Sequence, residues 1–338
     1  MRPTALMLVL STALALSVAC RLPGRMDATR AETLTLELKP GGQLRASAFN
    51  GGISVEGWER DEVSLVAEFT ERREGDIRFS AESRDGCVEI LAEQAGRSKY
   101  AISLGMPSGV SYTLKVPTKT TVKLVSSNGR IEIRKIDGEV EANTSNSSIT
   151  AEDIGGSARL RTSNSRITAS AINGGLIART SNAKLEAKDV TGDADLRTSN
   201  GGIDAKNVKG KADAVTSNGS IVAENIGGDL TGSTSNGRVD INKVSGAVDL
   251  ATSNASVKAA DLNGGGRGIM LTTSNGSIDV TLGQATGLVE ATTSRDYSVI
   301  IEVPNVQLTK DGSTTKVKVG PGNQSIRLKT SNGKITVR

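Results

Sequence analysis

An asparagine returns every eighteen residues through the middle of this chain of 338 residues. Most copies close a Thr-Ser-Asn triplet, and one longer step of 21 residues leads to Asn275. A fixed period with fixed residue types is typical of stacked structural repeats. We call the asparagines at this place in the pattern the ladder asparagines: Asn50, Asn128, Asn146, Asn164, Asn182, Asn200, Asn218, Asn236, Asn254, Asn275 and Asn332.

Apolar residues alternate on both sides of each ladder asparagine, which we number position 0. Aliphatic residues occupy positions +3 and +8, and glycine occupies position +10, as in Ile203, Val208 and Gly210. Positions −6, −4 and −2 also alternate with polar residues, and an alternation of period two predicts strands. Eighteen residues are too few for a leucine-rich repeat, which needs about 20–29. The sequence therefore predicts an all-β fold, a β-solenoid with parallel strands and about 18 residues per coil.

The asparagine itself is expected to have a structural role at a corner between two strands. Asparagine tolerates a positive φ, and its amide both donates and accepts hydrogen bonds. We expect the stacked amides to bond along the solenoid axis and to satisfy corner backbone groups. The interior should be narrow, because alanine is common at position +5 and aromatic residues make up 2% of the chain.

The flanking segments follow the same pattern more loosely, and no linker divides them from the repeats. We expect a signal peptide over 1–20, a short tether over 21–31 and one solenoid domain over 32–338. Within that domain, irregular coils are expected over 32–125, regular coils over 126–295, and irregular coils ending in a regular one over 296–338.

Several segments resemble a known family. They are Asn50-Gly51-Gly52-Ile53-Ser54-Val55-Glu56-Gly57-Trp58, Val122-Lys123-Leu124-Val125-Ser126-Ser127-Asn128-Gly129 and the repeated Thr-Ser-Asn-Gly. Together they are similar to the bacterial "putative adhesin" domain family of unknown function. The resemblance implies a single-stranded right-handed parallel β-helix in the cell envelope, and it brings no catalytic residues. The chain departs from the pattern at Arg295.

The first twenty residues read as an export signal, because Arg2 precedes an apolar run too short to span a bilayer. The signal ends at Cys20, which resembles the lipidated cysteine of a lipoprotein; ordinary signal cleavage is the alternative. We therefore expect an exported periplasmic or outer-surface lipoprotein, attached to the membrane through Cys20. The net charge of +4 is too small to indicate nucleic-acid binding.

The chain contains no histidine, which excludes Ser-His-Asp and Cys-His catalysis and histidine metal sites. We expect no enzyme activity, cofactor or metal. The expected function is a rigid binding or adhesin-like scaffold for an envelope glycan or protein. The alternative is a polysaccharide-active β-helix enzyme, a lyase or hydrolase that uses surface carboxylates, which would need carboxylates around a groove.

Two places are candidate binding sites. Arg161, Arg179 and Arg197 share position −3 and should form a stripe on one face, with a solvated charge face as the alternative. Arg295, Asp296 and Tyr297 break the pattern, which indicates either a binding loop or a packing irregularity. The last strand, Lys334 to Arg338, lacks an evident cap, so its edge is available for self-association with a second chain.

Overall fold

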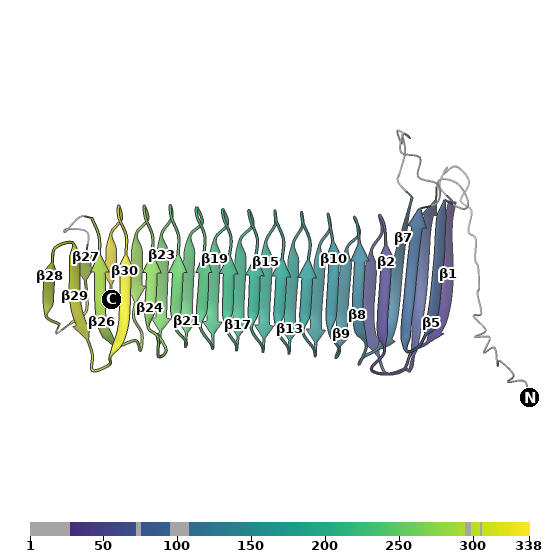
Figure 1. Ribbon diagram of the computed structural model, residues 1–338, viewed down its shortest axis with the longest axis horizontal. Helices are drawn as coiled ribbons and strands as arrows, with labels where there is room; N and C mark the ends of the chain where they lie inside the picture. Colours follow the sequence, from purple (N-terminus) through teal and green to yellow (C-terminus); the bar gives the residue numbers. More distant parts are fainter. Residues whose placement is uncertain (1–27, 72–75, 95–107, 295–298, 305) are drawn as a thin grey trace, which may run out of the picture.

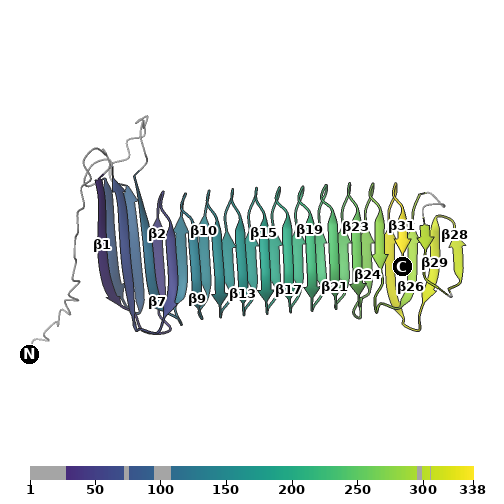
Figure 2. The same ribbon diagram turned by 180° about the vertical axis from the view of Figure 1, so that it is seen from behind.

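The protein is an elongated stack of strands in two facing sheets, seen from opposite sides in Figures 1 and 2. This computed structural model describes residues 28–71, 76–94, 108–294, 299–304 and 306–338. Over these ranges all regular secondary structure is β-strand. They contain no helix that is long and apolar enough to cross a membrane.

We name the two sheets sheet A and sheet B. They face each other along the whole length of the molecule. Sheet A contains, in spatial order, β1 (Ala28–Glu37), β4 (Glu62–Glu71), β7 (Gly109–Pro117), β3 (Ile53–Trp58), β9 (Ile131–Ile136), β11 (Ile149–Ile154), β13 (Ile167–Ile172), β15 (Leu185–Val190), β17 (Ile203–Val208), β19 (Ile221–Ile226), β21 (Val239–Val244), β23 (Val257–Leu262), β25 (Ile278–Thr281), β31 (Ile335–Val337) and β27 (Val299–Ile301). Sheet B contains β28 (Leu308–Asp311), β29 (Thr314–Val319), β26 (Gly287–Thr292), β30 (Gln324–Lys329), β24 (Ile269–Thr272), β22 (Val248–Ala251), β20 (Leu230–Ser233), β18 (Ala212–Val215), β16 (Ala194–Arg197), β14 (Leu176–Arg179), β12 (Ala158–Arg161), β10 (Val140–Thr144), β8 (Thr121–Ser126), β2 (Gln43–Ala48), β6 (Cys87–Gln94) and β5 (Ile77–Arg84).

In the central part each coil gives one strand to each sheet. Every such strand pairs in parallel with the strand one repeat away, so that Ile167 lies opposite both Ile149 and Leu185. The same register holds in sheet B, where Leu196 lies opposite Ala178 and Ala214. The predicted all-β solenoid with 18-residue coils is therefore confirmed.

The core lies between the two sheets and is built from the alternating positions. In the coil around Asn200, Leu196 at −4, Ile203 at +3 and Val208 at +8 are each 0% exposed. Alanine at +5 keeps the coil narrow, because larger side chains would overpack the space between the sheets. Threonine at −2 also faces inward: the Thr216 hydroxyl donates to the Gly201 carbonyl of the preceding coil over 3.0 Å. A buried hydroxyl needs such a partner.

The position of the left-handed residue differs from the expectation. Among the ladder asparagines only Asn50 has a positive φ (53°); in the regular coils the left-handed residue is at position +7, as in Ala171 (φ 53°) and Asn207 (φ 56°). Position +7 has no partner in the parallel ladder. The residues at positions +6 and +7 both point outward, which interrupts the strict alternation of the strand. Because of this interruption the side chain at +8 points into the core.

Glycine at position +10 is required by the close approach of successive coils. A Cβ on Gly192 would lie 2.6 Å from the Gly174 carbonyl oxygen and 2.8 Å from the Gly175 nitrogen, both backbone atoms. Neither can move without separating the coils. The adjacent Gly175 has room, since its Cβ would meet the Asp193 carbonyl oxygen at 3.5 Å.

We expect Gly192→Ala to lower the free energy of unfolding by about 1–3 kcal/mol, the usual cost of overpacking. Gly175→Ala should change it by less than about 0.5 kcal/mol, because its Cβ makes an ordinary contact. Urea unfolding of the two variants measures the difference. Equal stability of both variants would contradict the close stacking at this corner.

The N-terminal end is mostly a cap of antiparallel strands rather than the expected series of irregular coils over 32–125. β1 pairs antiparallel with β4, β4 with β7, and β5 with β6. The single coil made by β2 and β3 lies between this cap and the coil of β8 and β9. Phe69, Phe79 and Tyr112 pack together inside the cap, which explains why rings occur here rather than in the narrow coils.

The C-terminal end also differs from the expectation, because the last strand is not an edge. β31 lies between β25 and β27, and β30 lies between β24 and β26. The last coil is thus inserted beneath strands that precede it in the chain, and Figure 1 shows the C-terminus inside the row of strands. The premise that the strand from Lys334 to Arg338 presents an open edge is wrong. The outermost strands at this end are β27 and β28.

Candidate binding surface

The ladder asparagines line one corner of the solenoid as an exposed column of amides. From Asn128 onward each Nδ2 donates to the Oδ1 of the asparagine in the neighbouring coil, over 2.5 Å from Asn128 to Asn50 and 2.8 Å from Asn332 to Asn275, and the Asn50 Nδ2 donates to the Ser108 carbonyl. The corner backbone, contrary to expectation, bonds to itself: the Asn164 and Ser163 N–H groups both donate to the Ser145 carbonyl. The column therefore uses its donors and acceptors internally, and it presents few free groups to a ligand.

The arginine stripe lies on the outer face of sheet B, where Arg161, Arg179 and Arg197 are opposite one another in register. Two of them are paired. Arg179 contacts Asp195 over 3.0 Å, and Arg197 contacts Asp195 over 2.7 Å and Asp213 over 2.6 Å. The hydrogen bond to Asp195 raises the pKa of Arg197. The carboxylates of Asp195 and Asp213 thus neutralise most of the positive charge with which this stripe could bind an anionic ligand.

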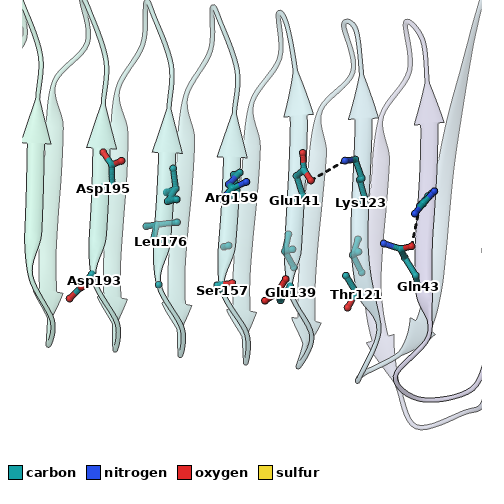
Figure 3. A pocket seen from close by; sticks show the side chains of 16 residues that line it. Gln43, Thr121, Lys123, Glu139, Glu141, Ser157, Arg159, Leu176, Asp193 and Asp195 are labelled. Atoms are coloured by element: carbon teal, nitrogen blue, oxygen red, sulfur yellow. Dashed lines mark hydrogen bonds and ion pairs between the residues drawn. The ribbon is translucent and has the colours of Figure 1, made fainter. Parts of the chain in front are cut away.

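A groove crosses the same face next to this stripe. It has a volume of about 810 Å³ and extends over the outward side of β2, β8, β10, β12, β14 and β16. It is lined from two outward rows, position −5 and position −7, and the second row contains Thr121, Ser157 and Gly175 as well as Glu139 and Asp193. Figure 3 shows its side chains projecting from consecutive strands.

The groove carries both signs of charge. Lys123 pairs with Glu141 over 3.1 Å, and this hydrogen bond holds the pKa of Glu141 below its usual value. Asp193 accepts the Lys211 backbone N–H over 2.7 Å. Arg159 stands exposed at the centre of the groove in Figure 3, and the structure shows no ion pair for it within the described ranges.

The remaining candidates lie outside the described residues. These are Cys20, the proposed signal peptide and tether up to residue 27, and Arg295, Asp296 and Tyr297. In the part of the chain that is described, no group of three or more acidic or cysteine side chains is arranged to hold a metal ion.

Sequence reasoning did not single out the groove. Its side chains come from position −7, which includes Glu139 and Asp193, and from position −5, a row that contains Lys123, Glu141, Arg159, Ile177 and Asp195. Because the row at −5 varies in residue type, it gave no motif. Position −7 is just as mixed, since Glu139 and Asp193 stand in it beside Thr121, Ser157 and Gly175.

The molecule is thus a β-solenoid with a polar groove on one face. No family model matches the chain, and no curated protein matches it. A solved structure described as "a putative cell adhesion protein from Clostridium sporogenes" aligns over 91% of this chain and 97% of its own, with 12% identity and a TM-score of 0.21. A TM-score this low supports no argument about fold or function.

Proposed function

We propose that this protein is a non-catalytic scaffold of the cell envelope that binds an extended polymer, a glycan or a polypeptide, along the groove of sheet B. The observation that carries the proposal is the groove itself, which runs across six consecutive strands of sheet B. Outward side chains repeat there at about 4.8 Å, the spacing between adjacent strands. A linear polymer lying along the axis would meet one set of outward side chains at each step, with charges of both signs along its length.

The alternative, a polysaccharide-active enzyme, has one observation in its favour, since four carboxylates line the groove. They are Glu139, Glu141, Asp193 and Asp195. Their arrangement favours binding. β10 and β16 are three strand spacings apart, about 14 Å, whereas paired catalytic carboxyl groups lie about 5–9.5 Å apart. Within each strand one carboxylate is already paired: Glu141 with Lys123, and Asp195 with Arg179 and Arg197.

A binding experiment tests the proposal through Arg159, which is central and exposed. We expect the domain from residue 28 onward to be retained by an envelope extract or a glycan array, and Arg159→Ala to weaken retention about tenfold, the effect of one charged hydrogen bond of about 1.4 kcal/mol. Arg166→Ala, on the outward side near β13 of sheet A, is the matched control. Equal retention of the two variants would show that the groove does not bind the ligand.

Measured cleavage of a glycan that is lost in Glu139→Gln would instead establish the enzyme alternative. Glu139 suits this test because it is an exposed groove carboxylate with no hydrogen bond or ion pair in the described part of the chain.

Membrane attachment through Cys20 is part of the same proposal. We expect Cys20→Ser to move the protein from the membrane fraction to the soluble exported fraction, because a serine hydroxyl does not receive the thioether-linked lipid. Fractionation with mass spectrometry of the mature N-terminus checks this. An unchanged membrane fraction would show that a different feature anchors the protein.

A further inference from the structure

Several ladder asparagines are followed by glycine, the sequence in which asparagine deamidates most readily. The backbone nitrogen of the glycine attacks the side-chain Cγ, loses its proton and forms a cyclic succinimide, while ammonia leaves. Water then opens the ring to aspartate or isoaspartate. Glycine favours this reaction because it has no Cβ to obstruct the approach. An exposed column of such residues is chemically vulnerable.

At these corners a hydroxyl group contacts the attacking nitrogen. The N–H of the glycine donates to the Ser or Thr hydroxyl at position −2 of the same corner, over 3.2 Å from Gly219 to Thr216 and 3.0 Å from Gly129 to Ser126. We call this contact the hydroxyl clasp. It is present at Gly129, Gly201, Gly219, Gly237, Gly276 and Gly333.

Whether the clasp is present depends on the residue at position +1. Where serine or alanine follows the ladder asparagine, at Ser147, Ser165, Ala183 and Ala255, the threonine hydroxyl still bonds a carbonyl of the preceding coil, but the structure shows no clasp. Within the described residues, the clasp thus occurs at those ladder corners whose sequence is prone to succinimide formation. The exception is Asn50–Gly51, where position −2 is Ala48 and no hydroxyl is available.

The second reacting group is also restrained. The Asn218 amide donates to Asn200 over 2.8 Å and accepts from Asn236 over 2.7 Å, so its Cγ cannot rotate toward the nitrogen without breaking both bonds. We propose that the six clasped Asn–Gly bonds are latent deamidation sites, kept unreactive by the hydroxyl clasp acting together with the amide column.

The chain contains its own comparison at Asn263–Gly264. This bond lies in the three-residue insertion before β24, and the structure shows no acceptor for the Gly264 N–H among the described residues. The Asn263 side chain lies outside the amide column. In the folded protein Asn263 should therefore deamidate faster than Asn218.

Deamidation of a ladder position would alter the column. The new carboxylate has no hydrogen to donate, so at position 218 it would face the Asn200 Oδ1 without a bond. It would also add a negative charge to a column of neutral amides. The clasp therefore protects the stacking of the coils as well as the individual residue.

Thr216→Val tests the proposal, because it removes the hydroxyl and keeps the shape. After incubation of the folded protein at mildly alkaline pH, peptide mapping should show deamidation at Asn218 increased about tenfold, the effect of one lost hydrogen bond on a rate. Thr216→Ser should restore protection, since Ser126 forms the same clasp. Thr180→Val, beside Asn182–Ala183, loses an equivalent bond to a carbonyl and should show no increase.

The wild-type protein supplies a second test that needs no variant to fold. Asn263 should deamidate several times faster than Asn218 in the folded state, and the two rates should converge in denaturant. Equal rates in the folded protein, or equal rates in Thr216→Val and Thr216→Ser, would overturn the proposal.

Discussion

Leu176→Asp should destabilise the solenoid by about 3–5 kcal/mol, because it leaves an unpaired carboxylate in the core. Leu176 is 1% exposed and faces the interior from β14. Among the described residues no lysine or arginine is buried in the core, so the charge must either stay unpaired or open the strand toward solvent. Chemical denaturation measures the loss.

The neighbouring substitution Ile177→Asp is the matched control. Ile177 is also aliphatic but is only half-buried, and it lies on the outer face between Arg159 and Asp195. An aspartate there would be attracted by Arg159 and repelled by Asp195, with a net change within about 1 kcal/mol. A loss at Ile177 as large as that at Leu176 would show that the parity of β14 is wrong.

Leu328→Ala should destabilise the C-terminal end by about 2–5 kcal/mol through the cavity that it creates. Leu328 is 1% exposed in β30, which lies between β24 and β26. The loss of stability should therefore also affect the neighbouring strands β24 and β26, which are distant from Leu328 in the sequence. We expect faster amide hydrogen exchange in β26 and in β24, as well as in β30 itself.

Lys329→Ala, at the next and outward position, should leave exchange unchanged in all three strands. Faster exchange confined to β30 and the residues after it would contradict the insertion of the last coil. It would indicate a terminal coil that frays at the end of the stack, as a simple repeat order would give.

The regular coils could be predicted from sequence because each inward position repeats at a fixed interval. Ile203 and Val208 recur as aliphatic residues one repeat away, and this recurrence defines both the strands and their parallel register. The amide column follows from the same register, since residues one repeat apart must stack.

The two ends could not be predicted in this way. Asn332 bonds to Asn275 across 57 residues, and Asn50 bonds to Asn128 across 78. Which strands become neighbours there depends on long-range contacts that no local period encodes. Conversely, the left-handed residue at +7 had a readable signal, because Asp or Asn stands there in five of the regular coils: Asp153, Asp189, Asn207, Asn225 and Asp261.

The groove was the hardest feature to predict from the sequence, because no repeated residue type marks its lining. Position −5 shows a mixture of charges that reads as ordinary surface. Position −7 is mixed as well, with Glu139 and Asp193 beside Ser157 and Gly175, so neither row gave a sequence motif.

The distance between spin labels on one outward row tests the central claim, the stacking of one repeat directly on the next. In a background with Cys20 and Cys87 replaced by serine, labels would be placed on Thr150→Cys with Asp240→Cys or Lys258→Cys, five and six coil steps away in sheet A. At about 4.8 Å per step, the separations should be about 24 and 29 Å. If the repeats instead formed successive hairpins in one sheet, each would add two strands, and separations near 48 and 58 Å would contradict the solenoid.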